Sequence, residues 1–335
     1  MYKILIKEKV LKDRKYFKSC HASTLTVLPN GNILSAWFGG TQEGADDVAI
    51  WGAVRENDSW SEPFKIADEE GLPHWNPVLF TRGGRVFLFY KVGHEISDWY
   101  TRYTVSEDNG KTWSEPVELV KGDRGGRGPV KNKMLVLSNG AWIAPASTEK
   151  GMWKAFADIS YDDGRTWLRS EDICIDFLKH SPADTDNATV SEQSFLRRGV
   201  IQPTLWESEP GKVHMLLRST EGFIYRSDSE DYGKSWSEAY PTALPNNNSG
   251  IDLVKHGNGV LYLAYNPIGE NWGPRTPIVL AASSDNGISW KEQLVLDDGP
   301  GEFSYPAVIS DGEDILITYT WKRENIAFWR ISTQV

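Results

Sequence analysis

The chain has 335 residues, 12% of them aromatic, with 15 tryptophans, 30 glycines and a formal net charge of −10 at pH 7. This acidity argues against nucleic acid and against an anionic membrane as partners, and no run approaches the ~18 apolar residues of a transmembrane helix. Many aromatic residues and glycines favour short strands joined by tight turns.

The N-terminal residues, MYKILIKEKV, alternate apolar and charged side chains. This alternation predicts a strand over residues 2–7 and lacks the apolar core of a signal peptide. As given, the chain is expected to be cytoplasmic; a signal removed from it would make the protein secreted or periplasmic. Cys20 and Cys174 have no C-x-x-C spacing and are expected to be free thiols.

Further along the chain, the motif S-x-D-x-G-x-T/S-W recurs four times. It occupies 106–113, 160–167, 229–236 and 283–290, and a shortened copy, RENDSW, occupies 55–60. From Trp60 to Trp290 the motif tryptophans lie 53, 54, 69 and 54 residues apart. Ser, Asp and Gly favour turns and Trp needs an apolar contact, so the motif predicts packed turns rather than catalytic groups. A period of this kind indicates a repeat architecture.

Six hairpin dipeptides, each followed by an apolar strand, count the repeats a second time. They are Asn30-Gly31, Gly83-Gly84, Asn139-Gly140, Pro210-Gly211, Asn258-Gly259 and Asp311-Gly312. Both counts predict an all-β fold, a six-bladed β-propeller with four-stranded antiparallel blades. Residues 1–335 are expected to form one domain, in which the N-terminal strand supplies the outer strand of the last blade and closes the ring.

The innermost strand of each predicted blade begins with polar or aromatic side chains. Because these strand starts converge at one end of the central channel, they predict a shared pocket; its candidate members are His21, His74, Trp75, Asn76, Lys131, Asn132, Lys133, Gln202, Asn248, Asp252 and Tyr305. Strand capping is an equal alternative for Asn76 and Asn248.

Two arginines occupy equivalent ends of adjacent predicted blades. Arg218 ends a strand of the fourth blade and Arg275 precedes a strand of the fifth. A surface salt bridge is the ordinary interpretation of one such arginine, whereas two favour a shared ligand. Guanidinium groups bind carboxylates through two parallel hydrogen bonds, so we expect an anionic ligand.

On this repeat and blade count, the chain resembles the sialidase (neuraminidase) superfamily, in which the repeat is called the Asp box. The resemblance covers nearly the whole chain and implies an exo-acting glycoside hydrolase that releases a terminal acidic sugar without a cofactor. Arg218 and Arg275 match two of the three arginines that hold the substrate carboxylate in that family. Tyr305, in GEFSYPAVIS, matches the nucleophilic tyrosine, and Asp46 or Asp47, in FGGTQEGADDVAIW, matches the acid/base aspartate.

Two positions depart from the family pattern. His21 stands where sialidases have their first arginine, and Gln202 stands where a glutamate assists the tyrosine. Glu302 and His21 are the candidates to replace that glutamate. His21, Lys131 and Lys133 are expected to shape specificity, with Asn132, Trp75, Asn248 and Asp252 also in the substrate-binding set. These departures favour a non-standard acidic sugar.

Three functions are open at this point. A tyrosine nucleophile suits an acidic substrate, because the neutral phenol is not repelled by the carboxylate beside the anomeric carbon. Alternatively, His and Tyr could abstract the proton beside a uronate, which would make the protein a polysaccharide lyase or place it near rhamnose–uronate glycosidases. The third function is non-catalytic glycan binding. No metal site is expected, because the six histidines are scattered without ligand spacing, and the sequence leaves the oligomeric state open.

Overall fold

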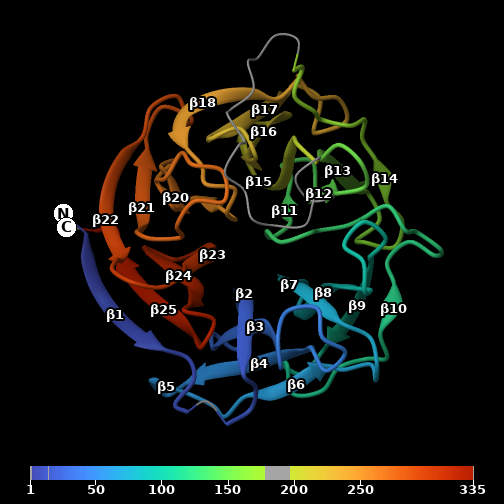
Figure 1. The fold of residues 1–335 in the computed structure, drawn as a ribbon, viewed down its shortest axis with the longest axis vertical. Coiled ribbons are helices and arrows are strands. Elements are labelled where there is room, and N and C mark those ends of the chain that lie inside the picture. Colours follow the sequence, from blue (N-terminus) through green and yellow to red (C-terminus); the bar gives the residue numbers. More distant parts are fainter. Residues whose placement is uncertain (1, 14, 178–196, 335) are drawn as a thin grey trace.

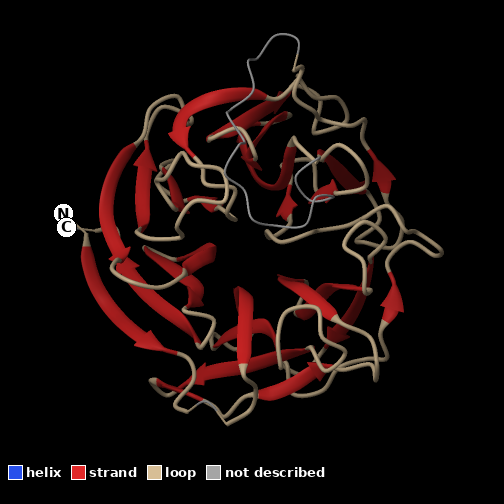
Figure 2. Cartoon of the chain, in the orientation of Figure 1, coloured by secondary structure: helices blue, strands red, loops and turns tan. Residues whose placement is uncertain are grey.

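The computed structural model describes residues 2–13, 15–177 and 197–334. The described regular structure is entirely β, and six antiparallel sheets stand around a central axis (Figures 1 and 2). The prediction of a six-bladed all-β propeller is therefore confirmed. Among these residues, no helix is long and apolar enough to cross a bilayer.

The blades follow one another in chain order, each running from the axis outward. The first holds β2 (Ser19–Val27), β3 (Ile33–Gly40) and β4 (Ala49–Glu56), with β5 (Ser59–Trp60) and β6 (Phe64–Ala67) both pairing with β4. The second holds β7 (His74–Arg82), β8 (Arg85–Val92), β9 (Tyr100–Ser106) and β10 (Val117–Glu118). The third holds β11 (Leu135–Val136), β12 (Trp142–Thr148), β13 (Lys154–Ser160) and β14 (Leu168–Arg169).

The remaining three blades complete the circle. The fourth holds β15 (Val200–Glu209), β16 (Lys212–Ser219), β17 (Phe223–Ser229) and β18 (Tyr240–Pro245). The fifth holds β19 (Asp252–Lys255), β20 (Leu261–Tyr265), β21 (Ile278–Ser283) and β22 (Lys291–Asp297). The sixth holds β23 (Phe303–Asp311), β24 (Asp314–Trp321), β25 (Asn325–Ser332) and β1 (Lys3–Lys9).

The N-terminal strand closes the ring, as predicted. Strand β1 runs antiparallel to β25, with Lys3 opposite Ser332 and Lys9 opposite Ala327. The two chain ends consequently lie side by side at the edge of the molecule (Figure 1). Each blade thus has its inner strand near the axis and its outer strand at the rim.

Apolar side chains fill the spaces between neighbouring blades. Leu34, Phe38 and Ile50 of the first blade pack with Leu79 and Leu88 of the second, and all five are at most 2% exposed. Full burial of such a side chain contributes roughly 1.5–3 kcal/mol. A single sheet would leave these faces in water, so the ring is the arrangement that covers them.

The repeated motif forms turns at the periphery, and its aspartate is occupied within the motif. The carboxylate of Asp108 accepts hydrogen bonds from the amide and hydroxyl of Thr112 and from the hydroxyl of Ser106. The bonds from Thr112 lower the pKa of Asp108 to about 2. Gly110 has a φ of 80°, which favours glycine, and its carbonyl accepts from the Trp113 indole. The same aspartate contacts recur at Asp162, Asp231 and Asp285.

One inner strand is shorter than expected. The third blade was predicted to begin its inner strand at Lys131, but β11 covers only Leu135–Val136, because Lys131 and Asn132 use their polar side chains to reach across the channel. Most of the stretch 172–198 lies outside the described residues. Its described start contributes two isolated bridges, at Ile173 and Ile175.

Candidate active site

Four inner strands begin with a bulge, and three of the four bulge residues line the central cavity described below. Residues Ala22, Asn76, Gln202 and Tyr305 have φ values of 55°, 42°, 51° and 53°, and the strand register shifts at each. Such left-handed conformations cost of the order of 1–3 kcal/mol each in non-glycine residues and gather at functional sites. A proline follows three of them and has no N–H for the ladder, which suits a bulge.

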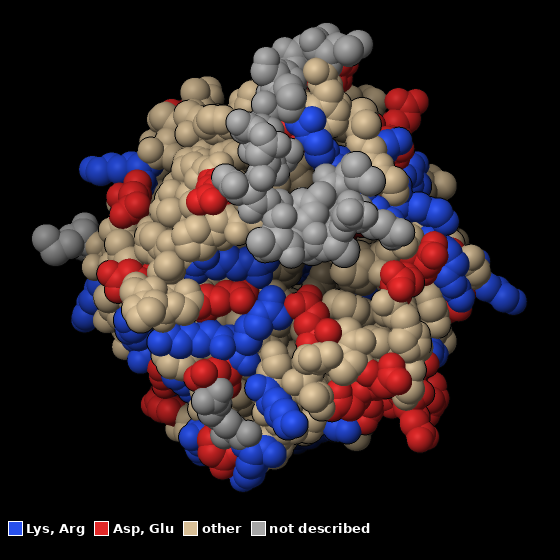
Figure 3. Space-filling model, in the orientation of Figure 1, with Lys and Arg blue, Asp and Glu red and all other residues tan. Residues whose placement is uncertain are grey.

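A cavity of about 280 Å³ lies at this end of the channel. Its polar lining consists of three arginines (Arg218, Arg275 and Arg323), two glutamates (Glu43 and Glu149), and Asn76, Gln202 and Tyr305. Its apolar lining consists of Trp75, Trp99, Trp153, Trp272 and Ile96. Figure 3 shows acidic and basic side chains intermingled around the hollow in the middle of this face.

Tyr305 is held by donors from the fourth blade. Nη1 of Arg218 lies 2.6 Å from the Tyr305 hydroxyl and also donates to Oε1 of Gln202 at 3.1 Å. Nε2 of Gln202 donates to the same hydroxyl at 3.4 Å, and Nε of Arg218 donates to Oδ1 of Asn248 at 2.7 Å. A negative charge developing on the Tyr305 oxygen would therefore face a guanidinium and an amide donor.

Glu302 is tied to the other two arginines. Nη1 of Arg275 donates to its Oε1 at 2.8 Å, and Nε of Arg323 donates to its Oε2 at 2.9 Å. Burial opposes ionisation of Glu302, but the arginines outweigh burial and hold its pKa well below the usual range. The candidate base Glu302 is therefore an ionised clamp on Arg275 and Arg323, and no described hydrogen bond joins it to Tyr305.

His21 lies beside Tyr305 without bonding to its hydroxyl. The two ring centroids are 4.2 Å apart, and Nδ1 of His21 contacts the hydroxyl of Thr320 at 2.9 Å. Burial, helped by the nearby Arg323, lowers the pKa of His21 well below its usual value, so the ring is neutral at pH 7. His21 is 1% exposed, so it supports the floor of the site.

Lys131 and Asn132 form a brace beneath the cavity. Nζ of Lys131 donates to Oδ1 of Asn132 at 2.8 Å, to the Ile251 carbonyl at 3.0 Å and to the carbonyl of Pro306. Burial lowers the pKa of Lys131 to about 7. Nδ2 of Asn132 donates to the carbonyl of Gln202 at 3.1 Å. These bonds from the third blade reach the fourth, fifth and sixth blades beside the two bulges that carry Gln202 and Tyr305.

Lys133 and Asp252 form a second link of the same kind. Nζ of Lys133 lies 2.9 Å from both carboxylate oxygens of Asp252. Asp252 also accepts from the hydroxyl of Thr204 at 2.6 Å and from the Val308 amide at 2.8 Å. Among the predicted substrate-binding residues, Trp75, Gln202, Arg218 and Arg275 line the cavity; Asn248, His21, Lys131, Asn132, Lys133 and Asp252 surround or support it.

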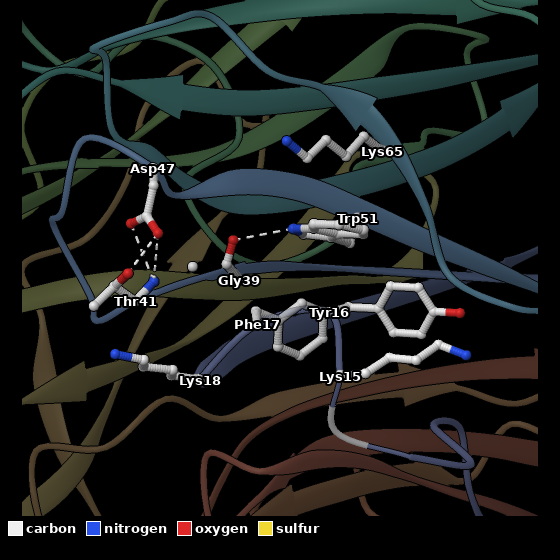
Figure 4. A pocket seen from close by; sticks show the side chains of 10 residues that line it. Lys15, Tyr16, Phe17, Lys18, Gly39, Thr41, Asp47, Trp51 and Lys65 are labelled. Carbon is white, nitrogen blue, oxygen red and sulfur yellow. Dashed lines mark hydrogen bonds between the residues drawn. The ribbon is translucent and has the colours of Figure 1, made fainter.

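The two predicted acid/base aspartates lie away from the central cavity. Asp47 accepts from the amide and hydroxyl of Thr41 at 2.9 Å and 2.6 Å in a different pocket (Figure 4), and the hydroxyl bond above all lowers its pKa. Asp46 is exposed and contacts Nε2 of His94 at 3.0 Å. Glu43, on the same loop, lines the cavity instead.

Sequence reasoning missed several lining residues. Arg323 follows β24, adopts a φ of 55° and also donates to Glu43. Burial raises the pKa of Glu149, which favours its protonated form. Trp153 and Trp272 flank Arg218, with their ring centroids 5.7 Å from its guanidinium carbon. All of these residues are in loops or at strand ends, where the blade period gives no signal.

The family follows from comparison with known proteins. A model described as a BNR repeat-like domain matches residues 31–317. The chain belongs to the BNR repeat-like family. The search of curated proteins found no match.

Solved structures show that this BNR repeat-like protein has the fold of sialidases. The Hadza microbial sialidase Hz136 superposes with a TM-score of 0.78 at 16% identity, covering 98% of this chain and 68% of that one. A protein of unknown function from Dyadobacter fermentans superposes with a TM-score of 0.76 at 14% identity, covering 99% of both chains. Trypanosoma rangeli sialidase with the inhibitor DANA superposes with a TM-score of 0.69 at 14% identity, covering 98% of this chain and 59% of that one. The structural likeness extends over almost the whole BNR repeat-like chain.

Among the described residues, no group of three or more His, Cys, Asp or Glu side chains gathers as a metal site. The chemistry of the cavity is instead that of arginines, carboxyl groups, a tyrosine and tryptophans. Such a mixture of aromatic walls and a few converging polar groups is typical of a small-molecule site.

Proposed function

We propose that the protein is a sialidase-like, exo-acting glycoside hydrolase that removes a terminal acidic sugar from a glycan. The observation that carries the proposal is the 2.6 Å contact between Arg218 and the Tyr305 hydroxyl in a cavity lined by three arginines. Most glycosidases use two carboxyl groups, and enzymes with a tyrosine nucleophile are an exception. A tyrosine suits a substrate whose own carboxylate would repel a nucleophilic Asp or Glu.

The arginines would bind the substrate carboxylate. Among the described residues, Arg218 donates only to neutral groups, namely Asn248, Gln202 and Tyr305, so its charge is available to an anion. Arg275 and Arg323 share Glu302 and are fixed in place by it. Arg323 thereby supplies a third guanidinium near His21, the position where sialidases have their first arginine.

In the proposed reaction, Tyr305 gives its phenolic proton to water in the cavity while Arg218 stabilises the oxygen, which attacks the anomeric carbon as the glycosidic C–O bond breaks. Water then hydrolyses the bond between the sugar and Tyr305, which regains its proton. The leaving oxygen needs a proton, and a general acid must hold that proton at the working pH. Glu149 suits this role because it lines the cavity and burial raises its pKa. Asp46 and Asp47 could act only if their loop turned toward Tyr305, whereas Glu149 and Glu43 already line the cavity.

A panel of aryl glycosides tests the proposal. We expect release of the phenol from an aryl sialoside or an aryl uronide, and we expect Tyr305→Phe to lower kcat about 10³-fold or more while binding persists. Turnover unchanged by Tyr305→Phe would contradict the nucleophile assignment. Binding without turnover of any acidic glycoside would favour a glycan-binding propeller.

The polysaccharide lyase alternative rests on one observation, the neutral ring of His21 beside Tyr305. Such a ring can accept the proton from the ring carbon that bears the carboxylate of a uronate. Its 1% exposure and its contact with Thr320 are the reasons for placing this function second. A lyase, but not a hydrolase, would form an unsaturated product that absorbs in the ultraviolet, so the same assays separate the two.

A further inference from the structure

We propose that a second pocket, on the outer part of the first blade, binds an acidic sugar unit of a glycan independently of the central cavity. This rim pocket has a volume of about 450 Å³. Residues 15–18 before β2, residues 39–41 at the end of β3, Asp47, and single residues of β4 and β6 line it (Figure 4).

Three half-buried aromatic rings form the apolar part of the rim pocket. The Trp51 centroid lies 5.4 Å from that of Phe17 and 5.9 Å from that of Tyr16. The Trp51 indole donates to the Gly39 carbonyl at 3.0 Å, which fixes its orientation. A Cβ at Gly39 would stand 3.0 Å from the Phe17 ring, so glycine permits this packing. Partly exposed Trp and Tyr rings offer a rigid apolar surface to the C–H face of a sugar.

Lysines supply the charge around these rings. Lys15 pairs with Asp13 and Glu62, and Lys65 pairs with Asp68. Lys18 is exposed and lines the pocket, and its ammonium has no hydrogen bond or ion pair to any described residue. On a chain of net charge −10, a lysine without an ion pair to a described residue, beside half-buried aromatic rings, favours a ligand with its own carboxylate.

Asp47 complements this cation. It is the acidic residue of the rim pocket, and Thr41 holds its carboxylate ionised by lowering its pKa. The carboxylate can accept a hydrogen bond from a sugar hydroxyl, while Lys18 pairs with the sugar carboxylate and Trp51 packs against the ring. An acidic sugar presents all three features at once, whereas a simple anion presents only one.

One loop separates the rim pocket from the central cavity. Glu43 lines the central cavity, and a Cβ at Gly44 would stand 3.2 Å from Trp75, which also lines it. Thr41 and Asp47, at the two ends of the same loop, line the rim pocket. A glycan chain held at the rim would therefore be kept close to the catalytic cavity, although binding at the rim does not require the cavity to be catalytic.

Titration calorimetry can test the rim site with trigalacturonate and with sialyllactose, each against its uncharged methyl ester. We expect wild-type protein to bind at least one of the two acids at two sites, and Arg218→Ala to remove only the central one. In that background, Lys18→Glu and Trp51→Ala should each weaken the remaining binding about tenfold or more. Lys111→Glu, the same charge change on an exposed turn, is the matched control and should leave it unchanged.

The outcomes separate this site from the proposed function. Loss of all binding in Arg218→Ala, or equal affinity in Lys18→Glu and Lys111→Glu, would overturn the rim site, as would equal binding of acids and esters. Hydrolysis of a small aryl glycoside should be unaffected by Lys18→Glu. A protein that binds at the rim but cleaves nothing would retain the rim site and contradict only the hydrolase.

Discussion

The motif turns at the periphery and the cavity at the axis use similar polar residues in opposite ways. At the periphery, Asp231 accepts hydrogen bonds from Ser229 and Ser235 of its own motif, so its partners are a few residues away in the sequence. At the axis, Tyr305 of the sixth blade meets Arg218 of the fourth, 87 residues earlier. Local partners repeat with the blades and build the fold, whereas long-range partners occur once and build the site.

The largest difference expected between axis and periphery comes from replacing one axial guanidinium by an ammonium group. Arg218→Lys keeps the charge but loses the fork that reaches Tyr305, Gln202 and Asn248, so kcat/KM should fall about 10²–10³-fold. Arg165→Lys makes the same change on an exposed motif turn and should leave kcat/KM unchanged. Equal activity of the two variants, measured on the best aryl glycoside, would remove the distinction between axis and periphery.

A stability comparison addresses the brace beneath the cavity. Lys131→Met leaves the buried carbonyls of Ile251 and Pro306 without their donor, and each unsatisfied group costs about 1–3 kcal/mol. Asp231→Asn keeps part of its motif's hydrogen bonds and should cost less, about 1 kcal/mol. Urea denaturation measures both. A smaller loss in Lys131→Met than in Asp231→Asn would show that the axis is held by packing alone.

The fold could be predicted because its information is local and periodic. The motif copies and hairpin dipeptides mark turns, and six blades are enough to bring Arg218, Arg275, Gln202 and Tyr305 to one end of the channel. The period does not reveal which side chain of a loop faces inward, so it did not distinguish Glu43 from Asp47. It also did not reveal Arg323 or Glu149, or that Lys131 would reach sideways to other blades.

The smallest expected effect is a pH dependence at the axis. The pKa of Glu302 is lower in the folded protein than in the unfolded chain, where an ordinary Glu titrates near ~4.3. The unfolded state therefore binds the proton more readily. The stabilisation that Glu302 provides is complete above that value and is lost as the pH falls below it.

Denaturation at pH 7, 4 and 3 measures this contribution. The free-energy difference between wild type and Glu302→Gln should be largest at pH 7 and shrink at pH 3. Glu107→Gln, at an exposed peripheral position, is the control and should show no such trend. A free-energy difference that is constant with pH would mean that the negative charge of Glu302, and so its pairing with Arg275 and Arg323, does not contribute to stability.

The central claim is that Tyr305 is the nucleophile of a hydrolase for acidic sugars, and covalent trapping tests it most directly. A difluoro sugar with fluoride on the anomeric carbon and a second fluorine on the neighbouring ring carbon, at positions 2 and 3 of sialic acid or 1 and 2 of a uronate, should form the glycosyl-enzyme and slow its breakdown. Intact-protein mass spectrometry should then detect one added sugar, and peptide mapping should place it on Tyr305. The Tyr305→Phe protein should stay unmodified. A label on a carboxyl group such as Glu149, or turnover without any trapped intermediate, would contradict the account.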